Sequence, residues 1–69
     1  MVDVNRLRDL IAERGLSQRK VAKLLGMAEK TFYNKMKSGV FVSTEMSALI
    51  EVLDISDPTG IFFTEFVSQ

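Results

Sequence analysis

Hydrophobic residues recur every three or four positions along most of this chain, which is the spacing of one face of an α-helix. Polar and charged residues separate the members of the first such stripe, which are Val4, Leu7, Leu10 and Ile11. Gly15 follows this stripe, and glycine ends helices readily because it adopts positive φ without a Cβ clash. The pattern predicts a first helix that opens at Asp3 or Asn5 and stops at Gly15.

A second, shorter helical pattern begins after Ser17. Its hydrophobic positions follow the i, i+3, i+4 spacing and are Val21, Leu24 and Leu25. Ser17 can cap the first turn, because its side-chain oxygen can accept a backbone N–H that has no partner within the helix. Gly26 stands where a helix C-terminus favours a left-handed residue. The pattern therefore predicts a helix of about two turns between Ser17 and Gly26.

A third helical pattern runs from about Ala28 to Lys37 and is closed by Gly39. Phe32 and Met36 are four residues apart and mark its buried side. Two helices joined by a short turn that contains glycine form a helix-turn-helix unit, whose second helix is shaped to enter a DNA major groove. We therefore expect a helix-turn-helix motif over residues 17–38, with its second helix as the reading helix.

The next segment predicts a loop and a fourth helix. Val40, Phe41 and Val42 form an apolar run that is short for a strand, so we expect a loop whose side chains pack on the core. Ser43 is expected to cap the helix that follows, and Glu45 would oppose the helix dipole in its first turn. The hydrophobic stripe of this helix is Met46, Leu49, Ile50 and Leu53.

The end of the chain carries two conflicting signals. Asp57 followed by Pro58 favours the start of a short helix, because proline suits the first helical position. Residues 61–67 are rich in aromatic and β-branched residues, which favours a strand. We expect the helix, and with it an all-α fold: a compact bundle of about five short helices that forms one domain over residues 1–69.

The zero net charge of the 69 residues conceals an asymmetry. Residues 1–37 carry all nine basic residues and four acidic residues, a net charge of +5. Residues 38–69 carry five acidic residues and no basic residue, a net charge of −5. Small domains can have uneven charge by chance, but such an asymmetry between halves also suggests a polyanion as partner of the basic half.

Several classes of protein are disfavoured by the composition. The chain has no histidine, which is the side chain most used for acid–base chemistry at neutral pH, and no cysteine. Charged residues interrupt the first ten positions, unlike a signal peptide, and no apolar run approaches the roughly 18 residues of a membrane span. We therefore expect a cytoplasmic protein that is not an enzyme and binds no metal, cofactor, small molecule or membrane.

The motif resembles that of Cro and phage-repressor domains, which belong to the xenobiotic-response-element class of bacterial and phage helix-turn-helix regulators. The positions that carry this resemblance are Gln18, Ala22, Gly26 and Phe32. The resemblance extends over about residues 4–63 and is most specific between residues 16 and 39. It implies a lambda repressor-like fold and a transcriptional regulator, a repressor or Cro-type protein, that binds double-stranded operator DNA.

Two positions depart from that family. Ala28 stands where many relatives have Ser or Thr, which would cap the reading helix and touch a phosphate. Lys35 stands where relatives often have an aromatic or aliphatic residue, and the inward residue here is Met36.

The resemblance also assigns DNA contacts. The residues that would contact bases are Glu29, Lys30, Tyr33 and Asn34. The residues that would contact the DNA backbone are Gln18, Arg19, Lys20 and Lys37. Lysine can pair with guanine and asparagine with adenine in the major groove. For further phosphate contacts, the region after the reading helix offers only Lys37, Ser38 and backbone amides.

Some of these residues have alternative roles. Glu29 can serve only as a first-turn acid that stabilises the helix dipole, and Tyr33 can cover the edge of the core. Arg19 and Lys20, together with Lys23, can form a solvated helix face.

Related regulators bind as pairs whose reading helices lie one DNA turn apart, so we expect a weak homodimer. Its contacts would come from the hydrophobic C-terminus, namely Phe62, Phe63 and Phe66, with Ile61. Ile61 and Phe62 can equally cap the core of the monomer. A competing function is a protein-interaction module that keeps the helix-turn-helix fold without DNA binding, which the zero net charge and the apolar C-terminus favour.

Overall fold

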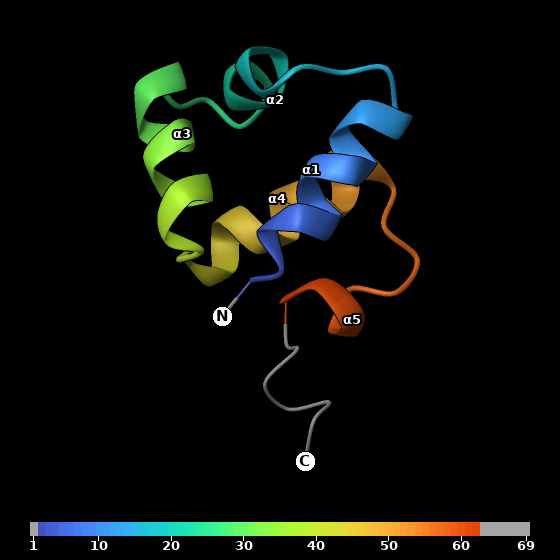
Figure 1. The fold of residues 1–69 in the computed structure, drawn as a ribbon. Coiled ribbons are helices and arrows are strands. Elements are labelled where there is room, and N and C mark those ends of the chain that lie inside the picture. Colours follow the sequence, from blue (N-terminus) through green and yellow to red (C-terminus); the bar gives the residue numbers. More distant parts are fainter. Residues whose placement is uncertain (1, 63–69) are drawn as a thin grey trace.

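The computed structural model describes residues 2–62, and these form five helices and no strand (Figure 1). The helices are α1 (Val4–Glu13), α2 (Gln18–Leu24), α3 (Glu29–Ser38), α4 (Ser43–Leu53) and α5 (Thr59–Phe62). Figure 1 shows α1 passing in front of α4, with α2 and α3 on one side of this pair and α5 on the other. The expected all-α bundle of five short helices is thus confirmed for these residues. None of the five helices is long and apolar enough to cross a membrane.

Most helix ends lie within a residue or two of their predicted positions, and predicted caps explain where α1 and α2 begin. Asp3, rather than Asn5, opens α1, because its Oδ1 accepts the backbone N–H of Arg6 at 3.2 Å. Ser17 Oγ accepts the backbone N–H of Lys20 at 3.1 Å and so caps α2. Ala28 precedes α3 without any side-chain hydrogen bond, which leaves this helix without a polar N-cap.

The start of α4 differs from the prediction. Val42 occupies the N-cap position and Ser43 is the first helical residue, so the prediction that Ser43 caps this helix is wrong. Glu45 Oε1 instead accepts the backbone N–H of Val42 at 2.9 Å, which is the arrangement of a first-turn carboxylate that reaches back to the cap. A valine can occupy the cap because Glu45 supplies the polar partner.

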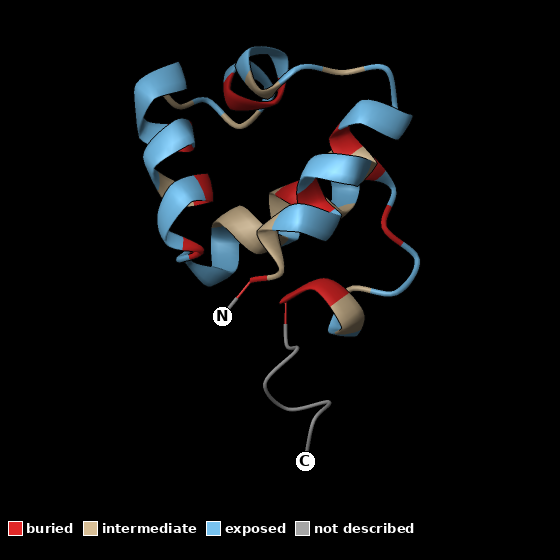
Figure 2. Ribbon diagram, in the orientation of Figure 1, coloured by how far each residue is buried: buried red, intermediate tan, exposed pale blue. Residues whose placement is uncertain are grey.

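The core is formed by hydrophobic side chains from all five helices (Figure 2). Its largest fully buried side chains are Phe32, Leu7, Met36, Leu49, Leu53 and Val21. The loop between α3 and α4 contributes Phe41, whose ring packs edge-on against Phe32 with centroids 6.0 Å apart. Each of the predicted hydrophobic stripes of α1, α3 and α4 therefore faces this core.

Val40 and Val42 do not pack on the core as expected, because their side chains are 62% and 54% exposed. Successive side chains of an extended segment point to opposite sides, so the burial of Phe41 between them turns both valines outward. The prediction of a loop is confirmed, and the prediction that all its side chains dock is wrong.

The first residues of the chain connect elements that are distant in sequence. The backbone N–H of Val2 donates to the carbonyl of Gly39 at 3.1 Å, and that of Asp3 donates to the carbonyl of Ile61 at 2.7 Å. Ile61 and Phe62 are both buried in the core. The N-terminus thus joins the end of α3 to α5, which closes the lower side of the bundle in Figure 1.

Arg14, at the C-terminal end of α1, connects this end to the C-terminal end of α4. Its Nε donates to the carbonyl of Leu53 at 2.8 Å and its Nη2 to that of Asp54 at 3.4 Å. These carbonyls lie at the C-terminus of α4, where a positive charge is favourable. One of the nine basic residues is therefore engaged in the fold.

Candidate nucleic-acid interface

Helix α3, predicted to be the reading helix, has one buried and one exposed side. Phe32 and Met36, with 0% and 2% of their surfaces exposed, face the core. Each residue of an α-helix turns about 100° from the previous one, so Asn34, two residues from both, lies on the opposite side. Lys30 and Asn34 are exposed and four residues apart, which places them one above the other on that outer side.

The predicted contact residues of α2 also lie at the surface. Arg19 and Lys20 are exposed, as is Lys23, and Gln18 is half-buried at the first turn of the helix. Lys37, near the end of α3, is exposed as well. All four residues predicted to contact the DNA backbone are therefore accessible to a ligand.

Gln18 and three of the four predicted base-contacting residues line one groove. This open groove between the start of α2 and α3 has a volume of about 450 Å³. Its lining residues are Gln18, Glu29, Lys30 and Tyr33. Tyr33 is 58% exposed, which favours a surface contact over its alternative role of covering the core edge. The groove therefore brings Gln18 beside three of the predicted base-contacting residues.

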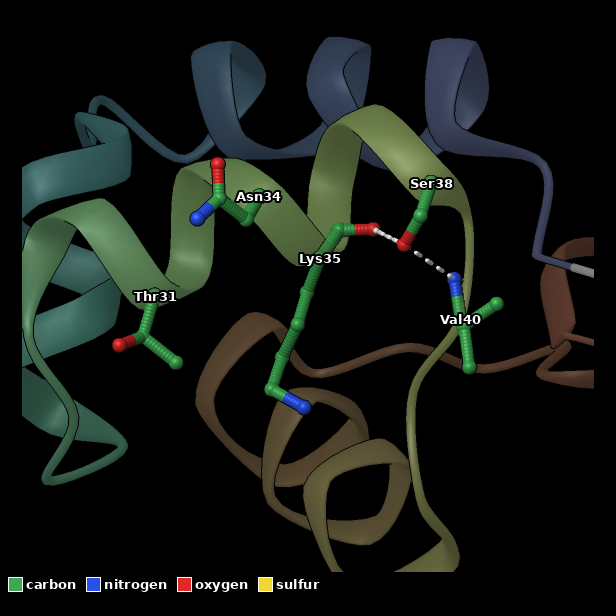
Figure 3. Close-up of a pocket in the computed structure, with 5 residues that line it drawn as sticks. All are labelled: Thr31, Asn34, Lys35, Ser38 and Val40. Atoms are coloured by element: carbon green, nitrogen blue, oxygen red, sulfur yellow. Dashed lines mark hydrogen bonds between the residues drawn. The ribbon is translucent and has the colours of Figure 1, made fainter.

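Asn34 borders a different groove, which is lined by α3 and the loop that follows it (Figure 3). The residues that line this groove are Thr31, Asn34, Lys35, Ser38 and Val40. Thr31 was not predicted as a functional residue, although its position three residues before Asn34 would have placed it next to the reading side. The predicted base-contacting residues thus divide between two neighbouring grooves.

Glu29 lies within the basic surface at the first turn of α3. Its Oε1 is 4.0 Å from Nε of Arg19, and both side chains are largely exposed. Exposed ion pairs stabilise a fold little, by about 0–1 kcal/mol. The carboxylate therefore offsets part of the positive charge of α2, and it also occupies the end of α3 where an acid is favoured by the helix dipole.

Lys35 and Glu45 form a partly buried ion pair between α3 and α4, with Nζ and Oε2 3.2 Å apart. The other oxygen of Glu45 accepts the N–H of Val42, as described above. One carboxylate of α4 therefore contacts both the loop and α3. Lys35 does not face the core, because Met36 fills the inward position.

The loop after α3 offers fewer phosphate ligands than expected. Ser38 Oγ donates to the carbonyl of Lys35 and accepts the N–H of Val40, both at 3.3 Å (Figure 3). The N–H groups of Val40 and Val42 thus both have intramolecular partners. Of the predicted ligands in this region, Lys37 is the one whose charged group is exposed and for which the structure shows no ion pair among residues 2–62.

Of the three predicted dimerisation residues, one lies inside the described region and two lie outside it. Phe62 is 3% exposed and packs in the core of its own monomer, which is the alternative role predicted for it. Phe63 and Phe66 lie outside the described residues. Within residues 2–62, no three His, Cys, Asp or Glu side chains are grouped so that they could hold a metal ion.

Comparisons of the chain with models of protein families, with curated proteins and with solved structures gave no match. The resemblance to Cro and phage repressors therefore rests on the motif residues themselves. The functional argument rests on the surface that α2 and α3 present.

Proposed function

We propose that this protein is a sequence-specific DNA-binding transcriptional regulator that places α3 in the major groove of operator DNA. The observation that supports this most directly is the two-sided character of α3. Phe32 and Met36 anchor one side in the core, and this leaves Lys30 and Asn34 outermost. Their side chains carry the groups that can pair with guanine and adenine.

The charge of the motif supports the same proposal. Between residues 18 and 37 six basic residues oppose one acidic residue, Glu29. Five of the six are exposed, since only Lys35 is held in a partly buried ion pair. A cationic surface of this kind attracts the phosphates of a duplex and releases counterions on binding. As part of this proposal, the protein would act as a repressor or Cro-type regulator in the cytoplasm of a bacterium or phage-infected cell.

A gel-shift titration at several salt concentrations tests the proposal. Each neutralised phosphate should contribute about −0.9 to the slope of log affinity against log salt. Reversing the charge of Arg19 and Lys20 to glutamate should weaken binding to all duplexes alike. Arg8→Glu makes the same kind of charge change on an exposed residue of α1, outside the motif, and should have a smaller effect.

A protein-interaction module is the second candidate, and the exposed valines of the α3–α4 loop favour it. Val40 and Val42 place two hydrophobic side chains in solvent, as does Leu24 at the end of α2. If the protein retards no duplex at about 50 mM salt, where phosphate contacts are strong, DNA binding is rejected and this second function takes its place.

A further inference from the structure

The groove at Asn34 combines a polar reading residue with an exposed hydrophobic one. It is open, has a volume of about 440 Å³ and is lined by α3 and the loop that follows it. Figure 3 shows Asn34 on the helix and Val40 at the loop end of the groove. Val40 is 62% exposed, which is the highest exposure among the large hydrophobic side chains of residues 2–62. Its side chain is therefore available to an apolar group of a ligand.

The polar groups around Val40 are already engaged. Ser38 Oγ donates its hydrogen bond to the carbonyl of Lys35 and accepts one from the N–H of Val40. The ammonium of Lys35 is 3.2 Å from the carboxylate of Glu45, so its charge is balanced. This end of the groove therefore offers a phosphate neither a free hydroxyl proton, nor the Val40 N–H, nor an unbalanced charge. A neutral, apolar group fits it better.

The major groove of DNA presents one apolar group, the 5-methyl of thymine. We propose that Val40 contacts the methyl group of a thymine beside the base that Asn34 reads. The inference rests on the proposed function and extends it, because it adds a specificity-determining residue outside the helix-turn-helix motif. Asn34 and Val40 border the same groove, so a duplex that lies along it can reach both side chains.

The test replaces thymine by uracil, which removes the methyl group and keeps the base pair. A binding site is first selected from a random pool of duplexes with the wild-type protein. Each thymine of this site is then changed to deoxyuridine in turn, and affinity is measured by gel shift. We expect one position at which binding becomes about fourfold weaker, the loss that corresponds to one buried methyl group.

Val40→Ala should weaken binding to the thymine duplex by a similar factor and should abolish the sensitivity to uracil. Val42→Ala is the matched control, since Val42 belongs to the same loop and is 54% exposed but does not line the groove. It should bind and discriminate like the wild type. Circular dichroism and thermal unfolding check that both variants fold, as expected for exposed side chains.

The outcomes separate this inference from the proposed function. If the wild type binds a specific site that lacks thymine, or binds equally well after every uracil substitution, Val40 is not a methyl contact, although DNA binding stands. The same conclusion follows if Val40→Ala remains sensitive to uracil. If both valine variants bind more weakly with no dependence on uracil, the loop contacts something other than thymine. If the wild type retards no duplex at all, both proposals fall.

Discussion

Asn34 faces outward because the residues two positions before and after it, Phe32 and Met36, face the core. Phe32 and Met36 are almost completely buried in the core, and a helix residue two positions from both lies on the opposite, solvent-facing side. An exposed amide at this position contributes little to folding, so its side chain is free to serve recognition. Lys30 stands four residues earlier on the same side and nearer the N-terminus of α3.

We predict that Asn34→Ala relaxes base preference at one position of the binding site, in keeping with adenine as the partner of asparagine. The discrimination lost should be about 1–3 kcal/mol, with folding nearly unchanged. Site selection from a random pool measures this. Lys20→Ala serves as the control, because a phosphate contact should lower affinity without altering the selected sequence. An unchanged sequence logo from a well-folded Asn34→Ala protein would show that this side of α3 does not read bases.

Glu29 is the acidic residue within the basic surface, and its pairing with Arg19 makes a second prediction at this scale. Glu29→Gln should bind DNA severalfold more tightly at low salt, because the change removes a repulsion and frees a cation. Affinity measured between about 50 and 200 mM salt should show a steeper slope. Glu51→Gln, a similar change on an exposed residue of α4, is the control. Weaker binding together with lost preference for cytosine would instead identify Glu29 as a base contact.

At the scale of elements, the turn between α2 and α3 sets the relation of the two motif helices. Gly26 adopts a φ of +75°, in the left-handed region, and a Cβ at this position would meet no atom within 4 Å. The requirement for glycine is therefore conformational and not steric. Ala28, which follows in the turn, provides no side-chain cap for α3.

Gly26→Ala should accordingly destabilise the fold by about 1–2 kcal/mol, the cost of a left-handed alanine. Gly60→Ala is the matched comparison, since Gly60 lies in α5 without a positive φ and its Cβ would be 3.4 Å from Asp57 Oδ2. That variant should unfold at the same temperature as the wild type or slightly above it. Thermal unfolding measures both, at about 4–8 °C per kcal/mol for a domain of this size. Equal effects of the two substitutions would contradict the conformational explanation.

Another element-scale feature is the attachment of the α3–α4 loop. Glu45 holds the N–H of Val42 with one oxygen and Lys35 with the other. Phe41 fixes the middle of the loop by packing on Phe32. These contacts give Val40 a defined position beside the reading helix, which a contact to a single methyl group requires.

At the scale of the whole molecule, charge and burial divide the chain differently. The basic half supplies α1, α2 and α3, whereas the acidic half supplies α4 and α5. Val2, Ile61 and Phe62 are nevertheless buried in the same core as Phe32. The two halves thus have opposite net charge but share one hydrophobic core.

We predict that two copies occupy a duplex with two half-sites one helical turn apart, because a single reading helix spans only one half-site. Sedimentation at DNA-binding concentrations measures the stoichiometry, with a duplex of one half-site as the control. Phe62 is buried in its own monomer, so Phe62→Ala should lower the unfolding temperature at every protein concentration. A strictly monomeric protein that binds one half-site on either duplex would contradict the prediction of pairing.

The sequence by itself determined the helices and the inner faces of α1, α3 and α4, because hydrophobic periodicity and glycine stops are local properties of the chain. In α2 the predicted stripe was wrong at Leu24, which is 50% exposed. The stripe in α4, the Ser17 cap and the stop at Gly26 all followed from residues within a few positions of one another. The opposition of Phe32 and Asn34 followed in the same way from helix geometry.

Tertiary structure decided whatever depends on partners distant in sequence. Arg14 bonds to the end of α4, 39 residues away, and no pattern around it indicates this. The charge of Lys35 is paired with that of Glu45. Val40 points outward because its neighbour Phe41 packs against Phe32. Local patterns fix which side of a helix is apolar, but only packing fixes which polar groups are already satisfied and which side chains remain for a ligand.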